Sequence, residues 1–503
     1  MSRRAAERQL SLPARPRHAQ LQRWLYDAIR AAILTGRLPP GTRLPASRDL
    51  ARQQGLSRGT VVLAYAQLAA EGYLAAAVGR GSYVAERLPD PEIPPPPRRR
   101  PGHSAKPAPM RLSKRGLMLA QSPFPPAANR QPATAFRGGQ PALDRFPIEL
   151  WTRIAARRSR LRQASLLGDG DAAGYLPLRR AIAEYLAVAR GLDCDAASVL
   201  ITASVQQGLD LCARLLLDPG DAAWMEDPGY PAARLVLAAA GAKVIAVPVD
   251  GEGLQVAEGI RRAPAAKLAY VTPAHQAPLG VALGLERRLQ LLRWATAADA
   301  YLFEDDYDSE YRFHGRPLAA LKSLDGSDRV IYAGTFSKLL FPGLRLAYLA
   351  LPATLAQPFA AAMSLTARHP PLPTQAILAD FIAEGHFARH LRRMRLLYAE
   401  RAAALQAAAV RHWGELLRLP PIEAGLETVA WLADGVADRT VVAAAAAAGI
   451  ELRGLSRYRI KAQRGDGLVL GFAATDPAGI DRGARRLAGI LVECASATSA
   501  DQR

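Results

Sequence analysis

The feature that most restricts the fold of this chain is an alternation of short β-rich runs with helical segments across residues 198–351. The β-rich runs are Ser198–Thr202, Ala222–Met225, Lys243–Val247, Leu268–Thr272, Tyr301–Glu304, Val330–Ala333 and Leu346–Leu351. Helical patterns lie between them, as at Gln207–Leu217, Tyr230–Ala240 and Leu285–Ala298. This βαβ repetition predicts an α/β domain with a mostly parallel sheet and helices on both faces, where ligands bind at the carboxyl ends of strands.

A single lysine follows the sixth of these runs. The stretch Val330–Arg345 ends its apolar part at a small-residue turn, presents Lys338 and reaches Arg345 seven residues later. A lysine held where a strand gives way to a loop can project its amine into a cleft and condense with an aldehyde. Pyridoxal 5′-phosphate (PLP) is the aldehyde used most often, and Arg345 can supply the cation for its phosphate. An isolated Ser-Lys pair is more often a surface turn, so the interpretation depends on the other strand ends.

Two other strand ends carry groups that suit the same cofactor. After the first run, Ser204, Val205 and Gln206 open a helix, whose free amides and dipole can hold a phosphate. After the fifth run comes Glu304-Asp305-Asp306-Tyr307, where a carboxylate can keep the pyridine nitrogen protonated and a phenol can hydrogen-bond the 3-oxygen of the ring. Each group also has a structural alternative, such as a turn or a helix cap.

Three further residues complete the predicted cofactor site. His275 lies in the turn Thr272–Gly280 and offers a polar group to the ring edge, Tyr230 can stack on the ring, and Thr335 begins the lysine-bearing turn. His275 alone would more often be structural, and Tyr230 alone could be packing. The order and spacing of the four loops together favour cofactor binding. No metal site is predicted, because the three cysteines are widely spaced.

Residues 15–87 are predicted to form a separate DNA-reading domain. An amphipathic helix at Leu21–Leu34, a short helix at Arg48–Gln54 with Ser47 as its N-cap, and a helix at Arg58–Glu71 make a helix-turn-helix pattern. Residues 75–84 then read as a two-stranded wing. A small helical protein-interaction domain with a basic face is the alternative.

The DNA contacts are predicted from the positions of polar and basic residues in this pattern. The N-terminus of the last helix would enter the major groove, two arginines would contact phosphate, and the arginine at the tip of the wing would enter the minor groove. These residues are Arg43, Ser47, Arg48, Ser57, Arg58, Thr60 and Arg80. Residues 1–110 hold 18 basic against 7 acidic residues, more than half of the net charge of +20, which indicates a polyanionic partner there.

Residues 88–133 are predicted to be a proline-rich linker between this domain and an α/β domain at 134–495. Arg98–Arg100 in the linker can add phosphate affinity or only solubility. The first residues lack the apolar core of a signal peptide, and the longest weakly apolar run, Val441–Ile450, is about half a membrane span. A cytoplasmic protein without membrane attachment is therefore expected.

The motifs resemble two known families. The pattern from Ile33-x-x-Gly-x-Leu to Gly-x-Gly-x-Tyr83-Val84 is similar to the GntR-type winged helix-turn-helix almost end to end. The α/β domain resembles fold-type I aminotransferases in four motifs, at 226–230, 272–280, 304–311 and 334–338. The whole chain resembles the MocR/GabR family, which joins these two domains.

This resemblance implies roles for the site residues. Lys338 would form the internal aldimine with PLP, with Asp305 at the pyridine nitrogen, Tyr307 at the 3-oxygen and Tyr230 against the ring. The residues implied near the phosphate are Ser204, Gln206, Thr335 and Arg345. The resemblance also implies a head-to-tail homodimer, in which each DNA-binding arm reaches the large domain of the partner.

Departures from the family pattern concern the phosphate and the effector. Val205 and Asp169 stand where many fold-type I enzymes have a serine and a tyrosine that help to bind phosphate, and Leu279 replaces a usual threonine. The strand at 468–472 lacks the arginine that clamps the substrate carboxylate in aminotransferases. Arg457 or Arg453, just before this strand, could take that place.

Three functions are compatible with these features. The first is a PLP-dependent regulator that binds a double-stranded DNA operator and responds to PLP or to an amine or amino-acid effector, such as γ-aminobutyrate or taurine. The second is an active aminotransferase with an accessory DNA-binding domain. The third is a DNA-binding scaffold that has lost PLP. The missing arginine and the complete winged helix favour the first, in which the aminotransferase-like domain is a sensor that can retain half-transamination.

Overall fold

The computed structural model describes residues 10, 12–13, 20–77, 81–89, 112–120, 135–161, 164–314, 318–462 and 465–501. The chain divides into two compact units, residues 1–110 and residues 111–503, and each is described by itself. Arg80, Arg98–Arg100 and most of the predicted linker lie outside the described residues. Inside that predicted linker, however, Lys114–Leu119 form a short helix, α4, which lies against α8 of the second unit.

The first unit is a winged helix-turn-helix. Its helices are α1 (Leu21–Leu34), α2 (Ser47–Gln54) and α3 (Arg58–Ala70), and its wing pairs β1 (Leu74–Ala77) with β2 (Gly81–Val84) in antiparallel register. The apolar faces of the three helices meet in a core that includes Leu25, Leu50 and Leu68. The hydroxyl of Ser57 caps α3 by accepting from the backbone N–H of Thr60 at 3.1 Å.

The expected cap of α2 is wrong. Ser47 is the first residue of that helix, and the N-cap position belongs to Ala46, which makes no side-chain cap hydrogen bond. Ala46 keeps a non-helical backbone, with ψ of 148°, and Ser47 already has helical geometry, so the helix begins one residue earlier than expected.

The second unit is built on an eight-stranded sheet, as the alternation of runs predicts. Its strand order is β3-β10-β9-β8-β7-β4-β5-β6. Neighbouring strands from β9 to β5 are parallel, whereas β10 and β6 run antiparallel to their neighbours. The strands are β3 (Val199–Thr202), β4 (Ala222–Asp227), β5 (Lys243–Asp250), β6 (Gly253–Leu254), β7 (Leu268–Val271), β8 (Tyr301–Asp306), β9 (Val330–Thr335) and β10 (Ala347–Ala350).

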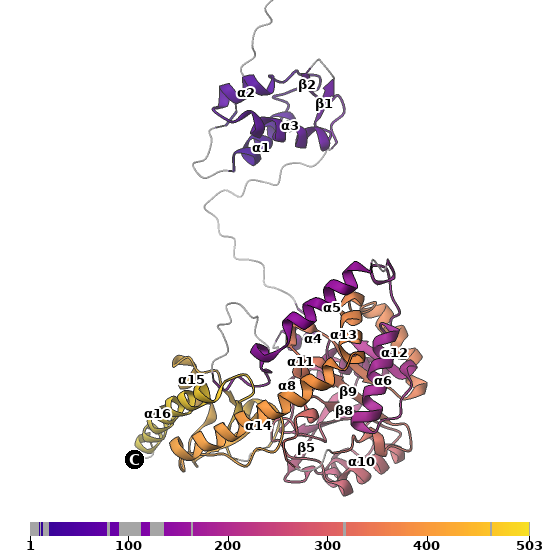
Figure 1. Ribbon diagram of the computed structural model, residues 1–503, viewed down its shortest axis with the longest axis vertical. Helices are drawn as coiled ribbons and strands as arrows, with labels where there is room; N and C mark the ends of the chain where they lie inside the picture. Colours follow the sequence, from indigo (N-terminus) through magenta and orange to yellow (C-terminus); the bar gives the residue numbers. More distant parts are fainter. Residues whose placement is uncertain are drawn as a thin grey trace, which may run out of the picture. The chain divides into compact units, whose positions relative to one another are not determined.

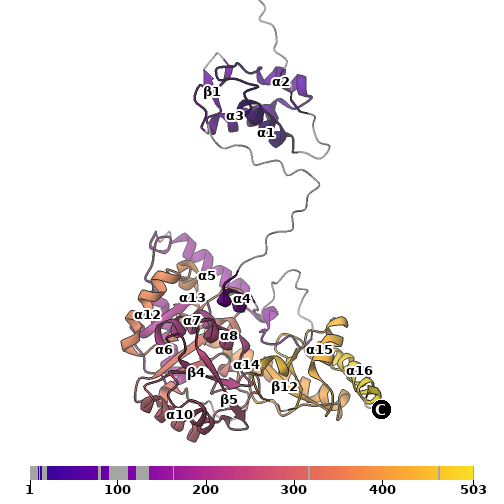
Figure 2. The ribbon, with the colours of Figure 1, turned by 180° about the vertical axis from the view of Figure 1, so that it is seen from behind.

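Helices cover both faces of this sheet (Figures 1 and 2). Successive strand residues point to opposite faces, so Trp224 packs on one side, where it stacks on Trp294 of α10, and Met225 packs on the other with α7 and α8. The helices of this part are α5 (Ile148–Arg160), α6 (Leu176–Arg190), α7 (Val205–Leu216), α8 (Pro231–Ala239), α9 (Val256–Arg262), α10 (Leu285–Ala297), α12 (Ala353–Thr366) and α13 (Leu372–Ala383).

A smaller lobe, residues 413–501, follows the long helix α14 (His386–His412) and lies beside the large sheet in both views (Figures 1 and 2). Its antiparallel sheet has the order β11 (Leu417–Arg418), β12 (Glu427–Leu432), β14 (Gly467–Gly471), β13 (Arg453–Gly454), and its helices are α15 (Asp438–Ala447) and α16 (Pro477–Asp501). Phe136 forms an antiparallel bridge with Gly471, so the segment that begins at Ala135 pairs with this lobe.

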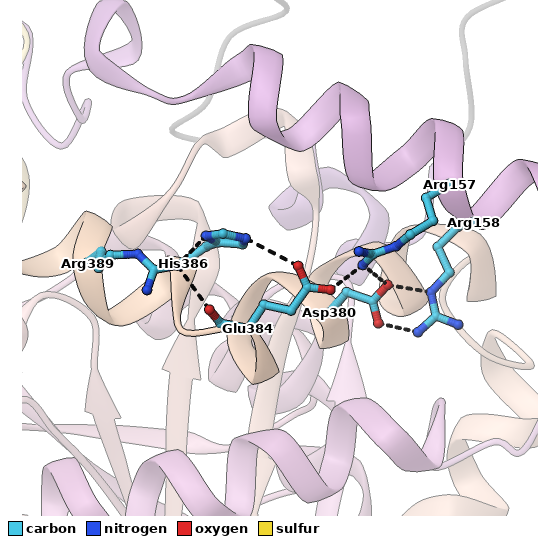
Figure 3. A network of polar contacts seen from close by, with 6 residues as sticks. All are labelled: Arg157, Arg158, Asp380, Glu384, His386 and Arg389. Atoms are coloured by element: carbon cyan, nitrogen blue, oxygen red, sulfur yellow. Dashed lines mark hydrogen bonds and ion pairs between the residues drawn. The ribbon is translucent and has the colours of Figure 1, made fainter.

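An ion-pair network fixes α5 to α13 (Figure 3). The carboxylate of Asp380 receives Arg158 Nε at 2.7 Å and Arg157 Nη2 at 2.9 Å, and Arg157 also pairs with Glu384. Glu384 lies 3.2 Å from a ring nitrogen of His386. Arg157 and Arg158 of α5 therefore share the carboxylate of Asp380, and this ion pairing holds α5 against α13. In the described part of the chain, no helix is long and apolar enough to cross a membrane.

Candidate functional site

Lys338 lies in a one-turn helix, α11 (Phe336–Leu339), where a loop was expected. Thr335 ends β9 and caps this helix, since its hydroxyl accepts from the backbone N–H of Ser337 at 3.1 Å. The half-buried Lys338 donates from Nζ to the carbonyl oxygen of Gly139 at 2.6 Å. Burial lowers the pKa of Lys338, which increases the fraction of its amine that is uncharged and nucleophilic.

Asp305 is on β8, which pairs with β9, the strand that precedes Lys338. Its Oδ2 accepts from the hydroxyl of Tyr270 at 2.5 Å, while its buried Oδ1 has no hydrogen-bond partner among the described residues. Burial raises the pKa of Asp305 to about 7, against the opposing effect of the Tyr270 hydrogen bond. A buried acceptor without a donor is costly and indicates a missing partner that carries an N–H or O–H.

Tyr307 and Asp308 both contact the same ring nitrogen of His275. The hydroxyl of Tyr307 lies 3.1 Å from His275 Nδ1, and the same nitrogen lies 2.9 Å from Asp308 Oδ1. Burial lowers the pKa of His275, but the charge and hydrogen bond of Asp308 more than offset it, so the net pKa is raised. His275 therefore positions the Tyr307 hydroxyl, and sequence reasoning did not find Asp308.

The loop that carries Tyr230 is fixed by backbone hydrogen bonds. The carboxylate of Asp227 accepts from the N–H groups of residues 460, 461 and 462 at 2.8–2.9 Å, and the N–H of Gly229 donates to the carbonyl of Tyr458 at 2.9 Å. Burial and the nearby Asp305 carboxylate both raise the pKa of Tyr230. The structure thus brings Tyr230 within electrostatic range of Asp305.

The residues predicted at the phosphate meet at three neighbouring strands. Ser204 caps α7 by accepting from the N–H of Gln207 at 3.1 Å, and Val205 and Gln206 form the first turn of that helix. Ala347 of β10 lies opposite both Thr202 of β3 and Thr335 of β9, so the starts of α7 and α11 are close.

Arg345, which precedes β10, joins the same region. It is exposed and has a left-handed backbone, with φ of 51°, directly after the 3-10 turn Pro342–Leu344. A non-glycine residue rarely adopts this conformation, and it is found at sites where the surrounding structure imposes it.

Four residues near Lys338 come from distant parts of the chain. Gly138 and Gly139 follow the Phe136 bridge, Glu427 begins β12, and Arg453 is on β13. Arg453 donates to the hydroxyl of Tyr458 at 3.5 Å and to the carbonyl of Gly138 at 3.3 Å.

The two arginines expected for the effector, Arg457 and Arg453, lie in different surroundings. Arg457 is exposed in the turn Leu455–Tyr458, whereas Arg453 lies against Gly138, next to the glycine that accepts from Lys338. Two signals in the sequence could have revealed Glu427 and the glycine pair. Glu427 is a charged residue at the start of a mostly apolar strand, and Gly138 and Gly139 are adjacent glycines shortly before α5.

In the first unit, Arg43, Arg48, Ser57 and Arg58 are exposed and Ser47 and Thr60 half-exposed. The hydroxyls of Ser57 and Thr60 form a hydrogen bond with each other, 2.8 Å apart, at the N-terminus of α3. Arg58 is the first residue of α3 and is exposed at the end that the helix-turn-helix geometry presents to a major groove.

These residues fit PLP. The unpaired Oδ1 of Asp305 can accept from a protonated pyridine nitrogen, the Tyr307 hydroxyl can reach a ring oxygen, and Lys338 supplies the amine. When bound, the cofactor supplies an aldehyde that reacts with amines. The protein's contribution is to orient the ring through Asp305 and to hold a nucleophilic amine beside it.

Comparisons with known proteins agree with both units. Residues 139–414 match the class I and II aminotransferases, and residues 21–84 match the gntR family of bacterial regulatory proteins. The chain is 41% identical over 457 residues to the probable rhizopine catabolism regulatory protein MocR of Rhizobium meliloti, covering 91% of each chain. It is 35% identical over 454 residues to the pyridoxine biosynthesis transcriptional regulator PdxR of Corynebacterium glutamicum, covering 90% of this chain and 92% of that protein.

A solved structure agrees with the fold of the second unit. LysN, an α-aminoadipate aminotransferase from Thermus thermophilus crystallised with a phosphopyridoxyl-leucine, superposes with a TM-score of 0.67 and 29% identity over 72% of this chain and 92% of that one. Fold and site together define a GntR-type DNA-binding domain joined to a PLP-binding, aminotransferase-like domain. The chain belongs to the MocR family of transcription regulators.

Proposed function

We propose that this regulator senses PLP, or an amine effector that reaches PLP at Lys338, and that occupancy of this site changes its binding to double-stranded DNA in the cytoplasm. The observation that carries the proposal is the arrangement of Lys338 and Asp305. A nucleophilic amine on α11, which follows β9, and an unsatisfied buried carboxylate oxygen on the neighbouring strand β8 occur in a chain that also contains a winged helix. The proposed cofactor and DNA contacts are the residues assigned from the sequence.

The test is an absorbance titration of the full chain with PLP, with affinity for its own upstream DNA measured in parallel. We expect a yellow Schiff-base band that is absent in Lys338→Ala. Lys322→Ala is a matched control, because Lys322 is also largely buried, donates to a backbone carbonyl (Val330, 2.8 Å), and has a pKa lowered by burial.

Two results would contradict the proposal. The first is a band that persists in Lys338→Ala. The second is steady keto-acid production at enzyme-like turnover with a DNA affinity that is indifferent to PLP and amines, which would instead support an aminotransferase with an accessory DNA-binding domain.

We also propose a head-to-tail homodimer. The family membership supports it. Sedimentation of the full chain measures its mass in solution. A monomer at concentrations where DNA is bound tightly would rule the dimer out.

A further inference from the structure

Glu427 is a charged residue at the start of a mostly apolar strand, β12. Its Oε2 is buried and has no hydrogen-bond partner among the described residues. A buried carboxylate oxygen without a donor is destabilising on its own, so its retention points to a ligand.

The surroundings of Glu427 are set by two glycines. A Cβ atom on Gly138 would lie 2.5 Å from Glu427 Oε2 and 3.3 Å from Arg453 Nη1. A Cβ atom on Gly139 would lie 3.6 Å from the same oxygen and would collide with Lys338 Nζ. The carboxylate therefore shares the surface of this glycine pair with the amine that reacts with the cofactor.

Two basic residues of the described chain, Lys338 and Arg453, lie within electrostatic range of Glu427. Burial lowers the pKa of Lys338, and the charge of Glu427 opposes this effect. Burial lowers the pKa of Arg453, but Tyr458 and Glu427 more than offset it, and the guanidinium also donates to Tyr458 and Gly138 at 3.3–3.5 Å. The charge of Arg453 is therefore already matched by Glu427, so a ligand carboxylate would have to compete with Glu427 for it. An entering ligand carboxylate would meet a like charge at Glu427, whereas a hydroxyl or ammonium would supply the donor that Oε2 lacks.

We propose that Glu427 determines effector specificity, and that the effector is an amine whose second polar group is a hydrogen-bond donor, a hydroxyl or a second amino group, rather than a carboxylate. This inference rests on the proposed amine sensing at Lys338.

The experiment uses three amines with the same four-carbon length: putrescine, aminobutanol and γ-aminobutyrate. Their affinities for the PLP-loaded full chain are read from the change in the cofactor absorbance band and, independently, from the shift in thermal unfolding temperature. We expect putrescine and aminobutanol to bind about tenfold or more tightly than γ-aminobutyrate, as for a hydrogen bond to a charged group.

Glu427→Gln should reduce the preference for putrescine and aminobutanol over γ-aminobutyrate. The reduction should be larger for putrescine, because the amide of glutamine still accepts from a hydroxyl but has no charge to attract an ammonium. Glu423→Gln is the control, because Glu423 is an exposed carboxylate of the same segment that pairs with Arg312. γ-Aminobutyrate binding as tightly as the other two, or an unchanged preference in Glu427→Gln, would overturn this inference alone. Absence of any amine response while PLP binds would overturn amine sensing itself, and the inference with it.

Discussion

The hydroxyl of Tyr270 donates to one carboxylate oxygen of Asp305 at 2.5 Å and leaves the other oxygen buried and unpaired among the described residues. Tyr270 is on β7 and Asp305 on β8, so neighbouring strands of the sheet fix the direction of the free lone pairs. Because Asp305 is on a rigid strand, its free carboxylate oxygen is already oriented before a cofactor binds.

Asp305→Asn is expected to weaken PLP binding by about tenfold or more, because an amide cannot balance the charge of a protonated pyridine nitrogen. Tyr270→Phe should weaken it less, since the carboxylate remains and only its orientation is lost. Absorbance titration with PLP measures both. Equal affinities for Asp305→Asn and the parent chain would show that Asp305 does not contact the ring.

The raised pKa of Asp305, about 7, makes the cofactor-free protein sensitive to pH. A carboxyl group whose folded pKa lies above its unfolded value of 3.8 binds more protons when folded, so stability is lost as the pH rises from about 4 to about 7, by up to about 1.4 kcal/mol per pH unit. The Asp305→Asn variant has no carboxyl group to titrate and should not lose stability in this way. Its unfolding free energy, measured with denaturant, should therefore increase relative to that of the parent chain between pH of about 4 and about 7, and the difference should be constant at higher pH. A constant difference at all pH values would contradict this.

Arg58→Ala is expected to weaken binding to the operator and to reduce the slope of log affinity against log salt by about 1, if Arg58 contacts one phosphate. A contact to a base edge would instead relax specificity at one position. Arg23→Ala is the control, since Arg23 is an exposed arginine of α1 that pairs weakly with Asp27. Fluorescence anisotropy at several salt concentrations separates these outcomes, and identical curves for Arg58→Ala and the parent would remove Arg58 from the interface.

Asp380→Asn is expected to lower the unfolding free energy by about 1–3 kcal/mol, because two arginines of α5 lose the charge of their shared carboxylate. Glu384→Gln should cost less, since Glu384 is more exposed, at 37% against 16% for the Asp380 side chain. Burial raises the pKa of Asp380, but the two arginines outweigh it and the net pKa is lowered, so this contribution is lost as the pH falls through that pKa. Denaturant unfolding at neutral and acidic pH checks both statements.

The sequence predicted the strands well, because β-rich runs bounded by turns are a local signal. The seven runs became β3, β4, β5, β7, β8, β9 and β10, and Lys338 and Asp305 lie at the ends where ligands were expected. Local spacing could not show that Glu427 and Arg453 approach Lys338, since their positions depend on how the small lobe packs against the large sheet. For the same reason the sequence left Arg457 and Arg453 as alternatives, and the contact of Arg453 with Gly138 is what distinguishes them in the structure.

The chain that leads from the DNA-binding unit has a short covalent path to the reactive amine. After α4, the described chain resumes at Ala135, pairs with the small lobe at Phe136, and three residues later provides the carbonyl of Gly139 that accepts from Lys338. A ligand that removes Lys338 from this carbonyl therefore releases one contact of the segment 135–139. The hold of the second unit on this segment thus depends in part on the state of the cofactor site.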